Sequence, residues 1–508
     1  MLTRPNAAIK EPLLRESASG FLVRVDSPPD LVRLYPSSPL LCSIRWVPPP
    51  RGAPKPVSAL QNKELGNALF ARRQYRAALE PYSLALDLAP SSPLSLTLRA
   101  NRAATFLHLG RPGAALIDCT TALADPTLPA PLARKVLFRT ASAHYGLGQF
   151  PAANDRLEQL LALHPDDADA LDLQRRTAVR LVESTRGEYD WAFLFAEAGR
   201  VPALDIAAYT SASFAPRAIP GRGRGLVATR DIARGELLLV AKPFASGLAD
   251  RDRTKFVVGA NLFTETVDPY ATADLVALLI ERLSDDPAAS KALFDLHPGD
   301  GFAAWSPSSN GVDQSRLEAI VTYNAFHTES LASKTASPAS DALDAIHAPS
   351  TIYHTPSFMN HACLGNVSYS FLADTLFLRA RCAIPPGTEL VDSYVDAMAA
   401  LPTRSSILAK HNFVCHCELC TADRVDGPDQ LATREALSTS LEALTDKIHG
   451  PSQADATQHV GSILSLVAAL QATYAPSRGA LRPALYRAFR LLAQTYARIG
   501  WAPAAVRT

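Results

Sequence analysis

The sequence has no long hydrophobic run, almost no net charge and few cysteines, and each of these shortages excludes a class of protein. The nearest apolar run, residues 273–283, contains Glu281 and Arg282 and falls short of the roughly 18 residues that span a bilayer. Fifty Lys and Arg residues balance 49 Asp and Glu residues, so no overall charge favours nucleic acid. A basic run at 217–234 is interpreted as a solvated rim. Seven cysteines do not make a secreted disulfide framework.

The first residues also lack the features of a targeting segment. Arg4 and Lys10 alternate with Glu11 and Glu16 without an apolar core, which is not typical of a signal or transit peptide. We therefore expect an intracellular protein, in the nucleus, the cytoplasm or both, because no long Lys/Arg cluster chooses between them. With 508 residues the chain is too long for one ordinary core, and two to four domains are expected.

The two ends of the chain differ in character. Residues 1–57 are rich in proline and predict a loosely held extension with one hairpin at most. Residues 427–508 have a helical pattern, and 485–500 has the small and large spacing of a repeat helix. The chain ends soon after this helix, so we expect a C-terminal domain that is small or incomplete.

Residues 58–186 predict three helical hairpins and a capping helix over 166–186. Small residues recur 12 positions apart, with a proline near position 24, which lets two antiparallel helices approach closely and stops the second. Successive units begin 37 and 38 residues apart, slightly more than the 34 of a tetratricopeptide repeat (TPR). A spacer without ligand and a peptide-binding groove are equally compatible with three repeats. The small residues and prolines of the three units are Gly66, Ala78, Pro90, Ala103, Ala115, Pro126, Ala141, Ala153 and Pro165. Cys119 is predicted to lie in the core of this helical region.

A bridging helical segment is predicted at 188–210, and from about residue 212 glycine turns and β-branched runs replace the helical pattern. Gly221, Gly223 and Gly225 alternate before an apolar strand; this allows a ligand to approach the backbone, although a plain tight hairpin explains it equally well. Residues 246–320 predict a helical insertion, and 327–350 a loop. The fold class is therefore multidomain α+β, with a strand-rich domain over 212–394 between helical regions.

The chemistry concentrates in residues 357–394 and in the segment 403–422 that follows. Cys415, Cys417 and Cys420 have the spacing of a zinc site in an intracellular chain. The fourth ligand is His416, Cys363 or water, and Cys363 is preferred because it is embedded in a polar turn. Without any family comparison, Asn360 and His361 are interpreted as side chains that hydrogen-bond the backbone of a sharp turn. Tyr394 is interpreted as a tyrosine at the end of a strand. Cys382 alternates within a strand and is predicted to pack.

Taken together, these motifs resemble those of SET-domain protein lysine methyltransferases, in particular the SET- and MYND-domain group and its fungal relatives with TPRs. The resemblance covers about residues 214–421, and the repeats are a separate match. The MYND zinc module is absent from it, because no Cys/His cluster lies between Cys119 and Cys363. The matching motifs, in order, are Gly223-Arg224-Gly225-Leu226, Asn360-His361-x-Cys363-x2-Asn366, Gly387-Thr388-Glu389-Leu390 up to Ser393-Tyr394, and Cys415-x-Cys417-x2-Cys420.

The resemblance implies a set of roles. Tyr394 would be the catalytic tyrosine, and zinc would bind Cys363, Cys415, Cys417 and Cys420. A protein substrate would present the lysine, and partners would bind the repeats or the C-terminal helices; neither a membrane nor direct nucleic-acid binding is expected. The residues implied to hold S-adenosylmethionine are Arg222, Gly223, Arg224, Gly225, Tyr323, Asn324, Asn360, His361 and Phe413.

Two departures from the family pattern concern the site itself. Gly365 stands where the family usually has proline, which predicts a looser turn near the cofactor. His411 stands where a tyrosine is common, which alters a wall of the expected lysine channel and the number of methyl groups added. A TPR scaffold whose SET domain binds the cofactor poorly or not at all is therefore the alternative function.

Overall fold

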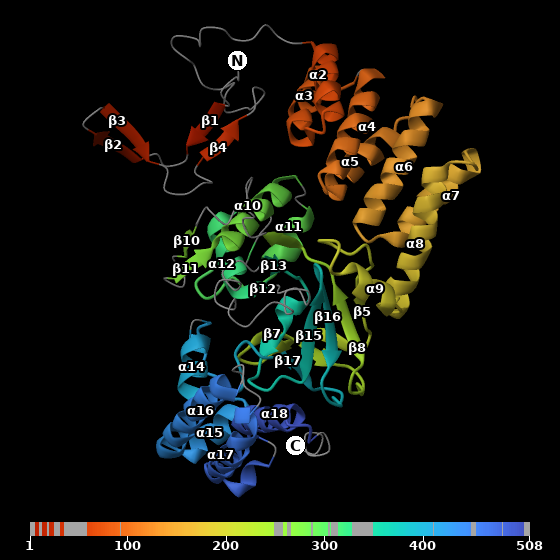
Figure 1. Cartoon of the computed structure of the whole chain (residues 1–508). Coiled ribbons are helices and arrows are strands. Elements are labelled where there is room, and N and C mark those ends of the chain that lie inside the picture. The colour runs from red at the N-terminus through yellow and green to blue at the C-terminus, as the bar shows by residue number, and fades with distance from the viewer. Residues whose placement is uncertain are drawn as a thin grey trace.

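A computed structural model gives the fold of the chain (Figure 1). It describes residues 58–501 apart from 92, 248–257, 262–265, 286–287, 303–304, 306–312, 328–348, 410, 449–453 and 480, and the backbone of four N-terminal strands. The fold class predicted from the sequence is confirmed: a helical arm, a strand-rich domain and a C-terminal helical region follow one another along the chain. The loop expected over 327–350 lies largely outside the described residues.

The four N-terminal strands form two antiparallel pairs, where the sequence predicted one hairpin at most. β2 (Leu13–Ser17) pairs with β3 (Gly20–Arg24) in a hairpin, and the strands that precede and follow it in the sequence, β1 (Asn6–Ile9) and β4 (Leu31–Leu34), pair with each other. The rest of the proline-rich extension falls outside the described residues.

The helical arm consists of three antiparallel helix pairs and a long capping helix. Its small residues lie where the helices meet: Ala78 and Ala103 are fully buried, and a Cβ on Gly66 would lie 2.6 Å from the ring of Tyr82. Cys119 is buried in the same core, as predicted. The elements are α2 (Ala59–Ala71), α3 (Tyr75–Leu88), α4 (Pro93–His108), α5 (Pro112–Leu123), α6 (Ala130–Gly146), α7 (Phe150–Leu163) and α8 (Ala168–Arg186).

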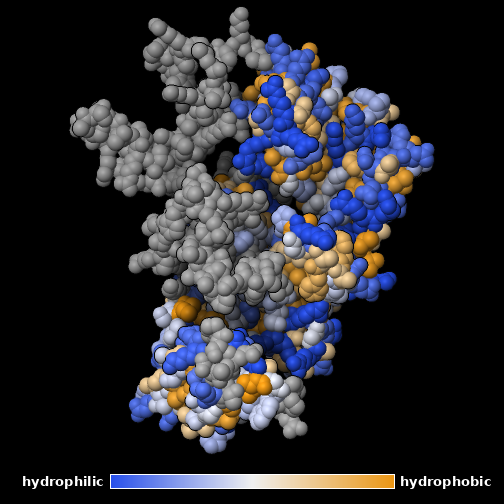
Figure 2. Space-filling view, in the orientation of Figure 1, coloured by the Kyte–Doolittle hydropathy of each residue, from blue (hydrophilic) through white to orange (hydrophobic). Residues whose placement is uncertain are grey.

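Local signals set the ends of this arm. The side chain of Ser58 accepts a hydrogen bond from the N–H of Gln61, and the N–H of Ser58 donates to the side chain of Gln61. This capping box begins α2. Asp167 caps the N-terminus of α8, and Gly187, with a φ of 67°, ends it. Figure 2 shows polar and apolar residues interspersed over the visible face of the arm.

The bridge from the arm to the next domain is mostly non-helical, so the prediction of a helical segment over 188–210 was largely wrong. Only α9 (Trp191–Glu197) is helical, and the chain then runs to β5 (Tyr209–Thr210). Tertiary hydrogen bonds hold this stretch: the N–H of Ala207 donates to Glu183 and its carbonyl accepts from the hydroxyl of Tyr189. The bridge therefore becomes an edge strand of the strand-rich domain.

The strand-rich domain contains two four-stranded sheets and one three-stranded sheet. Leu226, Leu238, Leu376 and Leu390 are fully buried in their shared core. Only the short β14–β17 pair is parallel among the described pairs. One sheet has the order β15 (Val367–Leu372), β16 (Thr375–Ala380), β8 (Leu237–Ala241), β5. The second has the order β14 (Asn360–His361), β17 (Glu389–Asp392), β7 (Gly223–Ala228), β6 (Phe214–Ile219), and the third β12 (Ala325–His327), β13 (Ser350–Ile352), β9 (Ala245–Gly247).

The insertion between β9 and β12 is mainly helical, as expected, and has its own apolar cluster around Leu275 and Leu317. A 3-10 turn, η4 (Pro356–Phe358), follows β13 and leads into β14. The elements of the insertion are β10 (Val258–Asn261), β11 (Thr266–Pro269), α10 (Tyr270–Asp285), α11 (Ala288–Phe294) and α12 (Gln314–Asn324).

The C-terminal helices pack at the end of the strand-rich domain opposite the helical arm (Figure 1). Leu470, Ala488 and Ile463 are fully buried in their core. No helix in the described part of the chain is long and apolar enough to cross a membrane. The elements are α14 (Leu401–Ala409), α15 (Glu418–Asp426), α16 (Pro428–Ile448), α17 (Ala454–Ala472), η5 (Pro476–Arg478) and α18 (Pro483–Arg498).

Candidate active site and metal centre

Four cysteine thiols from two distant segments meet beside β14. Cys363 follows this strand, while Cys415, Cys417 and Cys420 surround the start of α15. All four Sγ atoms lie within 4.8 Å of one another, and those of Cys363 and Cys420 are 3.4 Å apart. A tetrahedral zinc with Zn–S bonds of about 2.3 Å holds its sulfurs about 3.8 Å apart, so the cluster fits such an ion. His416, the alternative fourth ligand, is exposed and outside this group.

The electrostatics of the cluster favour deprotonation at one position first. Hydrogen bonds from Cys363 and Cys420 lower the pKa of the Cys417 thiol, while hydrogen bonds to Cys417 and Cys420 raise the pKa of Cys363. A thiolate is the form that binds a metal, and a bound cation stabilises the remaining thiolates in turn. The donor set is therefore suited to a soft divalent ion.

His361 connects the cysteine cluster to Tyr394. The backbone N–H of Tyr394 donates to Nδ1 of His361 at 3.0 Å, so the ring proton resides on Nε2. Nε2 lies 3.3 Å from Sγ of Cys363 and donates to it. Burial lowers the pKa of His361 to about 4, which keeps the ring neutral at physiological pH. One side chain thereby fixes the backbone at Tyr394 relative to a cysteine ligand.

Glu389 on β17 organises the neighbouring polar cluster. Its carboxylate accepts from Nη1 of Arg222 at 2.9 Å and from Nδ2 of Asn360 at 2.7 Å. Arg222 also donates to the carbonyl of His361, and Asn360 to that of Arg224. Gly225 lies directly beneath, since a Cβ there would be 2.5 Å from Oε1 of Glu389. The glycine turn, β14 and β17 are therefore fixed to one another.

Tyr394 follows β17 and lies at the surface of this cluster, with 41% of its area exposed. Its hydroxyl donates to the carbonyl of Met359 at 2.5 Å. Desolvation by the surrounding protein, supported by nearby Asp392, raises the pKa of Tyr394 to about 12. The hydroxyl is thus protonated at neutral pH, and because its proton is used by Met359, its oxygen offers lone pairs on the open side.

A row of aromatic rings extends from Tyr394 toward the insertion. The ring centroids of Tyr394 and His411 are 5.5 Å apart, those of His411 and Tyr323 are 6.2 Å apart, and those of Tyr323 and His297 are 5.8 Å apart. Asn412 donates to the hydroxyl of Tyr323 at 3.5 Å. His411 therefore lies directly beside Tyr394.

Some residues selected from the sequence have other contacts. Asn324 donates to the carbonyls of His297 and Ile320, so its side-chain amide forms hydrogen bonds within the insertion. Arg224 donates to the carbonyl of Asp295, and its guanidinium lies over the ring of Phe358.

Gly223 adopts a φ of +70°, in the left-handed region that favours glycine, and has open space around it. Phe413 packs at 5.9 Å from the ring of His361, beside the cysteine cluster.

Two interpretations from the sequence were wrong. Cys382 is exposed and lies just beyond the end of β16, so it does not pack in the sheet. Gly365 does not loosen its turn: a Cβ there would be 2.6 Å from the carbonyl oxygen of Val391, and the next N–H, of Asn366, donates to that same oxygen. Glycine at this position allows the turn to pack directly against β17.

Sequence reasoning missed the role of Glu389 and of the Met359 carbonyl. A signal for Glu389 was present, because a carboxylate beside the buried Leu390 in a short strand requires a polar partner. The Met359 carbonyl left no signal in the sequence. The site also depends on Asn366, whose side chain bonds the backbone of Glu389 and Val391 and fixes the turn after β14 to β17.

Comparison with known proteins identifies the same regions. Residues 223–395 match the SET domain family model. A methyltransferase of Gibberella zeae is 28% identical over 484 residues, which cover 92% of this chain and 64% of that protein. Human protein-lysine N-methyltransferase SMYD4 is 29% identical over 199 residues, covering 37% of this chain and 25% of that protein.

A solved structure, the first TPR of Spaghetti (RPAP3) bound to the HSP90 peptide SRMEEVD, is 28% identical. The matched region covers 24% of this chain and 93% of the chain of that structure, with a TM-score of 0.22. The chain thus spans less than two thirds of the length of the two methyltransferases it resembles.

Proposed function

We propose that this chain, in which TPR-like repeats precede a SET domain, is an S-adenosylmethionine-dependent protein-lysine N-methyltransferase that contains zinc. The observation that carries the proposal is the convergence of the glycine turn, Asn360 and Tyr394 at one edge of the domain, within the residues that match the SET family. Similarity to methyltransferases of Gibberella zeae and human supports the same reaction.

The polar cluster around Glu389 fits the amino-acid end of S-adenosylmethionine. Both amide hydrogens of Asn360 are used by protein acceptors, and its Oδ1 makes no hydrogen bond to the described residues, so it can accept from an ammonium group. Arg222 is partly exposed beside it, and its guanidinium has N–H groups beyond the two used by Glu389 and His361 that can donate to a carboxylate. Gly225 has no side chain, so nothing at this position intrudes on the Glu389 carboxylate. When bound, the cofactor supplies a methyl group on a positively charged sulfur.

Tyr394 is suited to position the amine of the substrate. Because its proton is donated to Met359, its oxygen can only accept, which orients an amine N–H toward it and the nitrogen lone pair away. The neutral amine is the reactive form, and Tyr394 and His411, whose ring centroids lie 5.5 Å apart, would line the site that receives it. Tyr394 need not act as a strong base, since its own pKa is raised to about 12.

Zinc at Cys363, Cys415, Cys417 and Cys420 would hold the segment carrying His411 and Phe413 against β14. This segment supplies a wall of the proposed amine site, so the metal has a structural role and all four positions are filled by protein ligands. Loss of zinc would then abolish activity through the loss of that wall.

The enzyme proposal is tested by incubating the zinc-loaded chain and S-adenosylmethionine, labelled in the methyl group, with a protein extract. We expect label on lysine, abolished by Tyr394→Phe and unchanged in Tyr486→Phe, which alters an exposed tyrosine on α18. If Tyr394→Phe kept its activity, the tyrosine would not have the proposed role. Absence of labelling by a wild type that binds the cofactor would favour a protein-interaction scaffold.

The repeats have a face suited to an acidic peptide, and we propose that partners bind there. Lys63 and Asn67 lie on α2, Asn101 on α4, and Lys135 and Arg139 on α6, the first helices of the three repeats. Nδ2 of Asn101 donates to Oδ1 of Asn67, and Arg139 donates to the carbonyl of Ala100, so these helices present their polar groups together.

Several donors on this face are available for a ligand. Asn67 accepts two hydrogen bonds through Oδ1, from Tyr82 and Asn101, which directs its own Nδ2 donors elsewhere. Lys63, Lys135 and Arg139 form no ion pair with the described residues, although carboxylates pair with many other arginines of this arm. Three unpaired cations and two amides match a peptide C-terminus with a further carboxylate nearby.

The partner proposal is tested with the peptide SRMEEVD as a free acid and as its C-terminal amide. We expect the free acid to bind at least tenfold more tightly than the amide, because a terminal charge is lost. Lys135→Ala should weaken binding of the free acid to a similar extent, while Lys291→Ala, in the insertion, should not. Equal binding of the two peptides would contradict a carboxylate-binding face.

A further inference from the structure

A buried network of five charges joins the cysteine cluster to the C-terminal helices. Asp423 and Asp426 belong to α15, the helix that begins at the cysteines, and they face arginines from three other elements, α14, α16 and η5. Every one of these side chains is at most 9% exposed. Arg404 contacts Asp423 at 2.5 Å; Arg478 contacts it at 2.8 Å and Arg434 at 3.2 Å; Arg434 also contacts Asp426 at 2.6 Å, and Arg478 contacts Asp426 as well.

Arg404 connects this network directly to a cysteine. Its Nη2 lies 3.8 Å from Sγ of Cys420 and also bonds Asp423, one helical turn further along α15. Nη1 donates to the carbonyl of Ala399 at 2.5 Å. The guanidinium thus donates to a cysteine sulfur, an aspartate and the backbone before α14 at once. A lysine has a single ammonium group and cannot make this planar arrangement.

The other end of the network holds the C-terminal helices. The guanidinium of Arg434 lies 3.8 Å from the ring centroid of Tyr474, and that of Arg478 lies 4.9 Å from it. The hydroxyl of Tyr474 accepts from the N–H of Ala484 at the start of α18. The charges on α15 are therefore linked through one aromatic ring to the helices α16 and α18.

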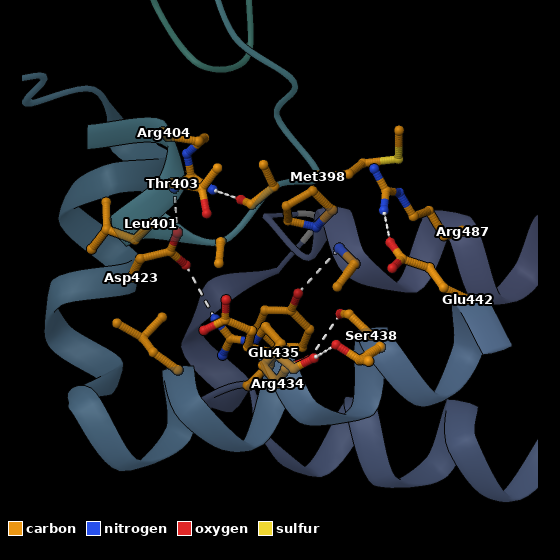
Figure 3. Close-up of a pocket in the computed structure, with 17 residues that line it drawn as sticks. Met398, Leu401, Thr403, Arg404, Asp423, Arg434, Glu435, Ser438, Glu442 and Arg487 are labelled. Atoms are coloured by element: carbon orange, nitrogen blue, oxygen red, sulfur yellow. Dashed lines mark hydrogen bonds and ion pairs between the residues drawn. The ribbon is translucent and has the colours of Figure 1, made fainter. Parts of the chain in front are cut away.

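The charges matter here because apolar packing is incomplete. A cavity of about 300 Å³ lies between α14, α16 and α18, with Arg404, Asp423 and Arg434 among its lining residues (Figure 3). Beside this cavity, α15 meets α14, α16 and η5 through ion pairs. If α15 left its position, Arg434 and Arg478 would keep buried charges without their aspartates, a strongly unfavourable state.

We infer that metal binding at the four cysteines and docking of the C-terminal helices are coupled through Asp423 and Asp426. The metal fixes α15, α15 supplies the aspartates, and the aspartates hold α16 and η5 through their arginines. Coupling of this kind is reciprocal, so the C-terminal helices also retain the metal. The inference depends on the proposed zinc site and is independent of methyl transfer.

The first test is hydrogen exchange of the full chain, zinc-loaded, stripped with a chelator, and reloaded with zinc. Stripping should accelerate amide exchange at least tenfold in α16 and around η5, and zinc should restore the protection, while α2–α7 remain unchanged as the internal reference. Faster exchange confined to 360–366 and 411–426 would overturn the coupling. A chain that binds no zinc would instead refute the metal site itself.

The second test measures the opposite direction with a residue that contacts no cysteine. Zinc release to a chromogenic chelator should be about tenfold faster in Arg478→Lys, because lysine cannot keep the contacts of Arg478 with both aspartates and coupling between two sites typically amounts to about 5–150-fold. Arg487→Lys, which alters exposed ion pairs with Asp396 and Glu442 at the same junction, should release zinc at the wild-type rate. Wild-type release by a folded Arg478→Lys would overturn the inference; should that variant not fold, the exchange experiment on the wild type still decides.

Discussion

Gly365 provides a quantitative test of how tightly the turn after β14 packs against β17. In Gly365→Ala the new Cβ would lie 2.6 Å from the carbonyl oxygen of Val391 and 3.0 Å from Cα of Asp392. Both atoms belong to the backbone of a strand and cannot rotate away. The turn would have to move by several tenths of an ångström, which lengthens the hydrogen bond from Asn366 to Val391, now 3.1 Å.

Overpacking of this kind costs about 1–3 kcal/mol of unfolding free energy. The control is Gly461→Ala, in the interior of α17, where nothing lies within 4 Å of the new Cβ. There alanine should stabilise the chain by about 0.5–1 kcal/mol, because glycine is unfavourable within a helix. Chemical denaturation of the zinc-loaded protein measures both. Equal stability of Gly365→Ala and the wild type would refute the close packing of this turn.

Three further outcomes are expected. Burial raises the pKa of Asp392 to about 6, while the unfolded carboxyl titrates near 3.9, so the wild type should lose stability relative to Asp392→Asn as pH rises from about 4 to 6; a difference constant with pH would contradict this. In Gly66→Ala the new Cβ meets the ring of Tyr82 at 2.6 Å, so the helical arm should lose about 1–3 kcal/mol, seen by its thermal unfolding. Cys417→Ser should reduce bound zinc, measured by mass spectrometry of the metal, whereas Cys382→Ser should not, because Cys382 is exposed and outside the cluster.

Much of the architecture followed from short-range patterns in the sequence. The spacing of Gly66, Ala78 and the later small residues predicted the helix pairs because helix contact requires small side chains at a fixed period. The spacing of Cys415, Cys417 and Cys420 predicted a metal cluster because few other functions place three thiols so closely. Each helix pair and the cysteine cluster are formed by residues that lie within a few dozen positions of one another, so a local pattern reveals them.

Features formed by residues far apart in the sequence could not be predicted. Asp423 meets Arg478, 55 residues later, and Glu389 meets Arg222, 167 residues earlier. Pairings of this kind depend on how the sheets and helices pack, which no local pattern encodes. The same reason explains the non-helical bridge after α9, because hydrogen bonds to Glu183 and β8 override its local helical pattern.

A calorimetric titration of the zinc-loaded chain with S-adenosylmethionine tests most directly whether the chain is an S-adenosylmethionine-dependent enzyme. We expect micromolar binding to one site per chain, lost in Asn360→Ala and retained in Tyr394→Phe, because Asn360 is proposed to hold the cofactor and Tyr394 to orient the substrate amine. Circular dichroism would establish that each variant is folded. No binding by a folded wild type would contradict the enzyme proposal.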